Sequence, residues 1–163
     1  MRGGWRTVGA WAVAPVVAAA AAGAAGAAGG GSVSGKFLGN GKDVKLAHAV
    51  AVPHEAWMDK EAWTVVLSEQ ASPPGGKPDW DGPFGRLGGA LAVAVTVEGS
   101  IFGTEVYHPA LERKPFSSIG SLKMEGFKID KGVVSGHLFM EGPADFFGET
   151  WQVDLTFSAP QRK

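Results

Sequence analysis

The stretch from Glu105 to Gly120, EVYHPALERKPFSSIG, gathers most of the reactive side chains of this chain into one short segment. It contains a possible base, His108, and two possible nucleophiles, Ser117 and Ser118. A nucleophilic serine needs a positioned base, an orienting acid and an oxyanion hole. No G-x-S-x-G turn accompanies these serines, and a Ser-Ser pair just before a strand is typical of turn chemistry. The segment therefore predicts a connection between strands, and no catalytic residue is assigned.

Two of the four histidines fall on apolar faces of predicted strands. His48 has the same parity as Val50 and Val52, and His108 has the same parity as Val106. Imidazole is the commonest metal ligand, so an interior histidine pair would suit a metal or a small ligand. The alternative is two core histidines with ordinary hydrogen-bond partners. Because no H-x-H or H-E-x-x-H spacing exists, we predict no metal site and no cofactor, and keep both histidines as candidate ligand-binding residues.

Two tryptophans complete the candidate ligand-binding set. Trp80 stands between Asp79 and Asp81 in a Pro/Gly-rich loop over residues 70–89. An exposed tryptophan flanked by acids can stack on a sugar or dock a partner, whereas a buried one only packs the loop. Trp63 is expected in the core or as a lid. The segment lacks the further oxygen ligands of a calcium loop.

The elements that must position these side chains alternate with a period of two. Asn40-Gly41 is a strong hairpin signal. A two-residue turn there pairs Phe37 with Val44, Gly35 with Leu46, and Val33 with His48.

A second hairpin is predicted at Glu98-Gly99. Its pairs are Val95 with Phe102, Val93 with Thr104, Leu91 with Val106, and Gly89 with His108. The opposite face of its first strand is unusually small, because it carries Ala90, Ala92, Ala94 and Thr96. We therefore expect another part of the chain to pack closely against that face.

The last strand, TWQVDLTFS, places four large apolar side chains on one face: Trp151, Val153, Leu155 and Phe157. It is expected to pair with the first strand, because sheet edges need cover. A bulge at Glu125-Gly126 would keep the strand before Lys131-Gly132 on one apolar face. Segments 54–62 and 108–113 are each expected to form a turn or two of helix.

The pattern predicts an all-β fold of about eight antiparallel strands, in a meander-type barrel or a two-sheet sandwich, with one or two short helical turns. Barrel and sandwich both remain open at this point. Residues 36–163 are expected to form a single domain, because their length suits one hydrophobic core.

Residues 1–28 have the layout of a secretory signal peptide: MRGGWR is basic, an alanine-rich apolar run follows, and small residues mark a cleavage site. The alternative is an uncleaved anchor, because the apolar run is about long enough to cross a bilayer. We expect cleavage, hence no membrane span in the mature protein, which would be periplasmic or extracellular. Residues 29–35 are expected to form a flexible Gly/Ser-rich start. No cysteine exists, so burial alone must hold the fold.

Charge gives little support to a nucleic-acid partner. The chain has 15 basic and 16 acidic side chains, scattered rather than clustered, and a formal charge of −1. A cationic footprint for nucleic acid is therefore missing. The leading hypothesis is an exported, non-enzymatic envelope domain that binds a small ligand or an envelope protein. The alternatives are a metal-dependent enzyme that uses the interior histidines, and a purely structural envelope module.

Three stretches carry a resemblance: GKFLGNGKDVKLAHAVA near the start, HPALERKPFSSIGSLKMEGFKI in the second half, and FGETWQVDLTF at the end. Together they resemble small exported bacterial β-domain proteins that are uncharacterised. The resemblance implies an exported bacterial β domain. It implies no activity, substrate or site residue.

Overall fold

The structure is a computed structural model that describes residues 30–163. The predicted signal peptide, residues 1–28, lies outside the described residues, so its cleavage stays a prediction. Within residues 30–163, no helix is both long enough and apolar enough to cross a membrane.

The described chain is almost entirely β, as the alternation of its residues predicts, with one very short helix. The elements, in chain order, are β1 (Ser32–Gly39), β2 (Lys42–Asp43), β3 (His48–Trp57), β4 (Lys60–Ser68), α1 (Pro78–Asp81), β5 (Ala90–Thr96), β6 (Ile101–Tyr107), β7 (Phe116–Ser117), β8 (Lys123–Asp130), β9 (Val133–Phe139), β10 (Ala144–Phe146) and β11 (Glu149–Pro160). The expected all-β class is confirmed.

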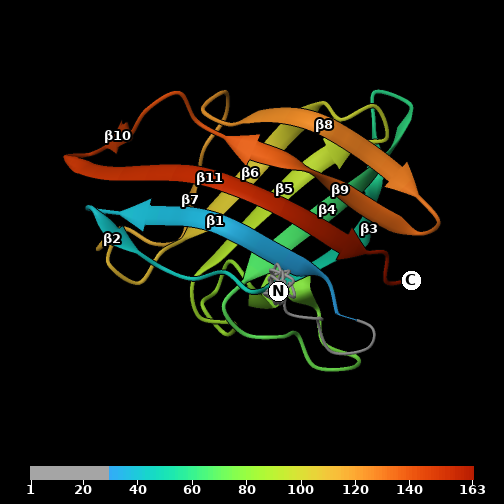
Figure 1. Ribbon diagram of the computed structural model, residues 1–163, viewed down its shortest axis with the longest axis horizontal. Helices are drawn as coiled ribbons and strands as arrows, with labels where there is room; N and C mark the ends of the chain where they lie inside the picture. Colours follow the sequence, from blue (N-terminus) through green and yellow to red (C-terminus); the bar gives the residue numbers. More distant parts are fainter. Residues whose placement is uncertain (1–29) are drawn as a thin grey trace, which may run out of the picture.

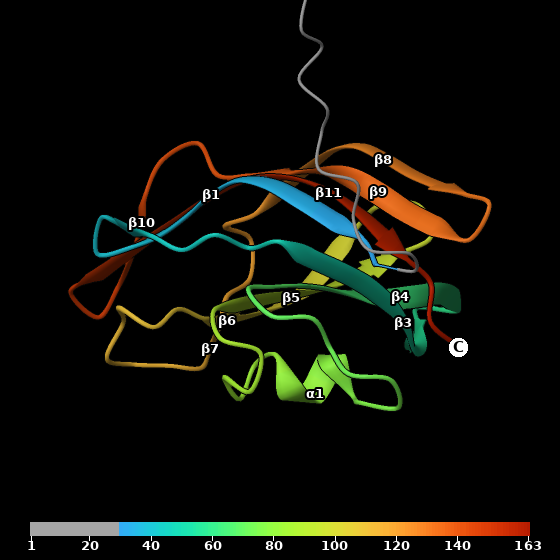
Figure 2. The same ribbon diagram turned by 60° about the horizontal axis from the view of Figure 1, so that its bottom comes forward.

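The strands form two antiparallel sheets, so the fold is a sandwich and the barrel alternative is wrong. Sheet A has the order β2-β1-β11-β9-β8, with β10 paired to β11, and sheet B has the order β3-β4-β5-β6-β7. Figure 1 looks through sheet A onto sheet B, whose strands run in a different direction. Figure 2 shows the two layers from the side, with α1 on the outer side of sheet B.

The last strand pairs with the first, as predicted, and joins the two ends of the described chain in sheet A. Val33 lies opposite Phe157, and Phe37 lies opposite Val153. Residues 32–35, expected to be part of a flexible start, are therefore in β1, because β11 offers them a complete backbone edge. Gly35 has a φ of +121°, and a Cβ there would meet the Asp154 carbonyl oxygen at 2.0 Å, so only glycine fits this close approach.

The hairpin at Asn40-Gly41 is real but much shorter than predicted. Leu38 pairs with Asp43, and the Val44 amide donates to the Phe37 carbonyl at 2.9 Å. Beyond Val44 the chain leaves sheet A, and the predicted pairs of Gly35 with Leu46 and of Val33 with His48 are wrong. The reason is that the segment after Val44 crosses to sheet B, where the Ala47 amide donates to the Ser68 carbonyl and His48 pairs with Ser68 of β4. β11 pairs with the opposite edge of β1 and does not compete with the hairpin.

This crossing also reverses the face that His48 was predicted to occupy. Ala49 and Ala51 lie opposite Leu67 and Val65 and face the core, so His48 lies on the outer face of sheet B. The side chain is half-buried there rather than interior. Small alanines, rather than the histidine and valines, therefore pack between the two sheets at this strand.

The hairpin between β5 and β6 has the predicted register over most of its length. Leu91 pairs with Val106 and Val93 with Thr104. The register shifts after Ala94, so Val95 lies opposite Ile101 and the predicted pairing of Val95 with Phe102 is wrong. In sheet A, the register between β8 and β9 shifts between Glu125 and Lys128, which confirms the predicted bulge.

Neither of the two predicted helical segments forms a helix. Segment 54–62 is the end of the β3–β4 hairpin, whose tip residues Met58 and Asp59 have φ values of +50° and +62°. Two successive positive φ values are the geometry of a tight hairpin turn. Segment 108–113 is a turn in which the Leu111 amide donates to the His108 carbonyl at 3.0 Å. The helix found within residues 30–163, α1, lies instead in the loop predicted from its proline and glycine content.

The space between the sheets is filled with apolar side chains. The largest that are fully buried are Trp151, Phe37, Leu67, Leu91, Leu111, Leu138 and Leu155. The predicted inward face of the last strand is confirmed, since all four of its large side chains are at most 2 % exposed. This core fixes the position of sheet B, whose other face carries the candidate site.

Candidate functional site

The structure does not bring the two candidate histidines together. His48 lies on the outer face of sheet B, whereas His108 follows β6 and is completely buried on the inner side. No group of three or more His, Cys, Asp or Glu side chains among residues 30–163 is arranged to hold a metal ion. The interior histidine pair that the sequence left open as a metal or ligand site is therefore not formed.

Both ring nitrogens of His108 form hydrogen bonds with backbone groups. Its Nδ1 accepts a hydrogen bond from the Ala110 amide at 3.1 Å, so Nε2 carries the proton and donates to the Phe37 carbonyl at 3.2 Å. The Phe37 ring meets the imidazole edge to face at 4.8 Å. Burial lowers the pKa of His108, and the hydrogen bond to Phe37 opposes that shift only in part. The neutral ring thus links β1 to the segment after β6 through its two hydrogen bonds.

The two serines after His108 gain no base from this arrangement. Both ring nitrogens of His108 are already engaged with backbone groups. The Ser117 hydroxyl donates instead to the carboxylate of Glu105, and the Ser118 hydroxyl donates to Ser121 at 3.0 Å. The segment is a connection between strands, as its sequence predicts.

The two candidate tryptophans lie in different environments. Trp63 packs in the core at 6 % exposure, and its indole Nε1 has no hydrogen-bond partner among the described residues. Trp80 lies on α1 and is 56 % exposed, with its ring centroid 4.7 Å from that of Phe84. Neither tryptophan lines the groove that the structure forms on the outer face of sheet B.

This groove has a volume of about 410 Å³. Its floor is the small-residue face predicted from the sequence, with Ala92 and Ala94 on β5 and Gly103 beside them on β6. The expected close packing occurs at the end of this face, where a Cβ on Gly82 would lie 3.4 Å from Ala90. Beyond that contact, the groove lies over the small side chains of the floor.

Aromatic rings close one end of the groove. Trp57, from the end of β3, stacks on Phe102 of β6 with centroids 4.8 Å apart and planes at 4°. Since β4 and β5 lie between those strands, the end of the β3–β4 hairpin must fold across the outer face of the sheet. The His54 ring meets Phe102 edge to face at 5.2 Å. Its Nδ1 donates to the Glu55 carbonyl at 2.8 Å, and this hydrogen bond does not involve Nε2.

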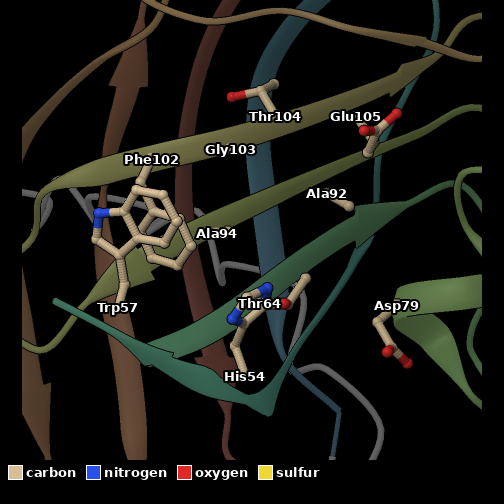
Figure 3. Close-up of a pocket in the computed structure, with 10 residues that line it drawn as sticks. All are labelled: His54, Trp57, Thr64, Asp79, Ala92, Ala94, Phe102, Gly103, Thr104 and Glu105. Carbon is tan, nitrogen blue, oxygen red and sulfur yellow. The ribbon is translucent and has the colours of Figure 1, made fainter. Parts of the chain in front are cut away.

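Carboxylates lie at the other end. Figure 3 shows Asp79 of α1 and Glu105 of β6 across the groove from the stacked pair, with His54 and Thr64 between the two ends. Glu105 accepts one hydrogen bond from Ser117. None of the residues that line the groove in the described part of the chain is lysine or arginine. The lining therefore combines an apolar end, an apolar floor and an acidic end.

Most residues of this groove were not identified from the sequence. The small face of β5 was, and Asp79 was noted only as a neighbour of Trp80. Trp57 and Phe102 are 45 positions apart in the chain, and only the fold of the hairpin end brings them together. One local signal existed: Trp57, Met58 and Asp59 precede a strand rich in apolar and β-branched residues, which is compatible with a hairpin as well as with a helix.

Comparisons with known proteins do not assign the chain to a family. The resemblance noted from the sequence therefore stays a prediction, and the function is inferred from the geometry and chemistry of the groove. Neither the protein-family models, nor the curated proteins, nor the solved structures give a match to this chain.

Proposed function

We propose that the protein is a non-enzymatic binding module that takes a small molecule into the groove on the outer face of sheet B. The observation that carries the proposal is the groove itself, with its volume of about 410 Å³ and its apolar floor. Pockets that hold small ligands are mostly apolar concave sites with a few convergent polar groups. Here the polar groups are Asp79, Glu105, His54 and Thr64.

The filled interior supports an outer site over an interior one. Core side chains from both sheets, such as Phe37, Leu91 and Leu138, are completely buried against one another. An interior ligand would have to displace such side chains, at a cost of several kcal/mol for each that loses its packing, on the order of 2–5. The groove needs no such displacement.

The histidine geometry favours binding over metal-dependent catalysis. A shared metal would need donor atoms about 2 Å from one ion, but His48 and His108 lie on opposite faces of sheet B. Both His108 ring nitrogens are also occupied. The metal-dependent alternative thus lacks the pair of ligands that it requires.

Export remains part of the proposal. The leader pattern of residues 1–28 supports secretion to the periplasm or beyond, and a cysteine-free chain with a filled core folds without disulfides. The physiological ligand would then be a molecule of the cell envelope or its surroundings.

Amide chemical shifts would test the site directly. Isotopically labelled protein, expressed from the full chain, would be titrated with a set of small amines, alcohols, carboxylic acids and oligosaccharides. We expect at least one compound to shift the amides of Ala92, Ala94 and Gly103 in a saturable way. The substitution Ala94→Leu, which fills the groove, should abolish these shifts.

The matched control is Thr156→Leu, which adds a leucine on the exposed outer face of sheet A. It should leave binding unchanged. The proposal fails if no compound of any class shifts the groove amides, or if binding persists unchanged in the Ala94→Leu protein.

A further inference from the structure

We infer that the groove is selective for small amphiphilic amines, with an apolar group against the aromatic end and an ammonium group at the acidic end. This inference rests on the function proposed above and adds the chemical class of the ligand. Three features of the groove carry it: the charge of its lining, the unused acceptors of its carboxylates, and the nature of its floor.

The carboxylates that line the groove are not balanced by basic side chains among the described residues of its lining. Asp79 and Glu105 line it, and the described lining contains no lysine or arginine. Two basic side chains near the groove are engaged elsewhere, because Arg86 pairs with Asp81 at 3.2 Å and Lys60 pairs with Glu98. Lys77, which precedes α1, does not line the groove. An anionic ligand would meet repulsion here, whereas a cation would meet two negative charges without displacing an ion pair.

The two carboxylates also have acceptor capacity to spare. An ionised carboxylate offers about four acceptor sites. Glu105 uses one for the Ser117 hydroxyl, and Asp79 makes no side-chain hydrogen bond or ion pair with residues 30–163. A primary ammonium group carries three donors that such unused acceptor sites can bind. Hydrogen bonds to charged groups are stronger than those between neutral groups, so this end of the groove favours a charged donor.

The floor argues against a polyol such as a sugar. Between its two ends the groove offers Ala92, Ala94 and Gly103, which have no polar side-chain atom. The described lining has two hydroxyl residues, Thr64 and Thr104, and Thr104 is only 4 % exposed. Sugar hydroxyls over that floor would lose water without gaining partners, which is unfavourable. An apolar segment has no such groups to desolvate, and the stacked Trp57–Phe102 pair extends its contact surface. The complementary ligand is thus apolar along most of its length and positive at one end.

Three probes of matched shape would test the class: phenethylamine, 2-phenylethanol and phenylacetate. They share one ring and one two-carbon skeleton and differ in charge, being positive, neutral and negative at pH 7. Titrations followed by the amides of Ala92, Ala94 and Gly103 should show the amine binding about tenfold more tightly than the alcohol, a ratio appropriate to two partly exposed carboxylates. The acid should bind more weakly than the alcohol. Raising the salt concentration should weaken only the amine.

Variants separate the carboxylates from general surface charge. Asp79→Asn and Glu105→Gln should each reduce the preference for amine over alcohol, and the double variant should remove it. The matched control, Asp130→Asn at the end of β8 in sheet A, should keep the full preference. The inference is overturned if the alcohol binds as tightly as the amine, or if Asp130→Asn removes the preference as strongly as the groove variants.

The outcomes distinguish the ligand class from the site. If the alcohol or an oligosaccharide binds in the groove as well as the amine does, the amine class is wrong and the small-molecule site stands. If none of the three probes and no oligosaccharide shifts the groove amides, both the class and the proposed function fail. Amine binding that survives Ala94→Leu would place the cation outside the groove and would likewise overturn both.

Discussion

The same strands form both faces of sheet B, but the inner face is packed and the outer face carries an open groove. On the inner face, Leu91, Val93 and Val95 alternate along β5, and all three are completely buried against sheet A. On the outer face, Ala92 and Ala94 occupy the positions between them, and the groove lies over these methyl groups. Adjacent residues of β5 thus pack in the core on one face of the sheet and line the open groove on the other.

The difference lies in side-chain size rather than in polarity, because both faces are largely apolar. Large residues on the inner face reach across to sheet A and fill the gap between layers. Small residues on the outer face cannot reach the elements that cover them, α1 and the end of the β3–β4 hairpin. These covering elements touch the sheet at Ala90 and Phe102 and leave the space between unfilled. We therefore expect changes on the inner face to alter stability and changes on the outer face to alter binding.

Trp63→Ala should cause a larger loss of stability than any other substitution proposed for either face. Trp63 is on the inner face of β4 and is buried in the core. Truncating a buried aromatic side chain to alanine typically costs about 3–5 kcal/mol, because the remaining cavity closes only in part. The free energy of unfolding, measured by urea denaturation, would show the loss. The groove should still bind its probes wherever the variant remains folded.

Trp63→Phe is the matched control for this change. The indole Nε1 of Trp63 has no partner in the described structure, so phenylalanine removes a buried unpaired donor and loses no hydrogen bond. It should therefore cost much less than alanine. A loss as large as that of Trp63→Ala would mean that the indole nitrogen has a partner, such as a buried water, and that this part of the inner face is not purely apolar.

Local sequence patterns predicted the elements that pair with near neighbours. The alternation of β11, the bulge in β8 and most of the β5–β6 register follow from residues close together in the chain. The long hairpin after Asn40-Gly41 was wrong, because the segment after Val44 leaves β1 and pairs with β4 in sheet B. A local turn signal contains no information about which sheet the following segment will join. His48 was assigned to the core for the same reason.

The candidate site was predictable only in its floor. Small side chains along one face of β5 indicated that another part of the chain would approach, and they did not indicate which part. Trp57 lies in a segment whose composition suits a helix, and its contact with Phe102 depends on the fold of a hairpin end over two other strands. The candidates chosen by residue type, His108 and Trp63, are buried in the core instead.

The acid sensitivity of the inner face should depend on His108. Burial lowers the pKa of His108 in the folded protein, while in the unfolded chain an imidazole titrates near about 6.5. Below that pH the unfolded state binds a proton that the folded state does not, so stability falls as the pH falls from 7.5 towards 5. Urea denaturation at these two pH values should show a loss on the order of 1 kcal/mol attributable to this residue.

His108→Gln isolates that contribution. The variant should be less stable at pH 7.5, because it replaces a ring whose two nitrogens both have partners, and it should lose less stability on going to pH 5. Asp43 and Glu149 also have lowered pKa values, and their stabilising contribution is lost only as the pH falls below about 4, in both proteins. Equal losses between pH 7.5 and 5 in both proteins would show that His108 is not held neutral by burial in the folded protein.

Adjacent substitutions on β5 should separate the two faces most sharply, although the expected change in stability is the smallest. Ala94→Leu points into the groove and should change the free energy of unfolding by less than about 0.5 kcal/mol, as surface changes usually do. Val93→Leu, one residue earlier, adds one methylene to the filled inner face and should cost about 1–3 kcal/mol through overpacking. Urea denaturation and probe titration of both variants would give opposite results: Ala94→Leu should be stable and unable to bind, and Val93→Leu should be less stable and able to bind. A large loss of stability in Ala94→Leu would mean that the outer face is packed in solution as tightly as the inner one, and the groove would then not be open to a ligand.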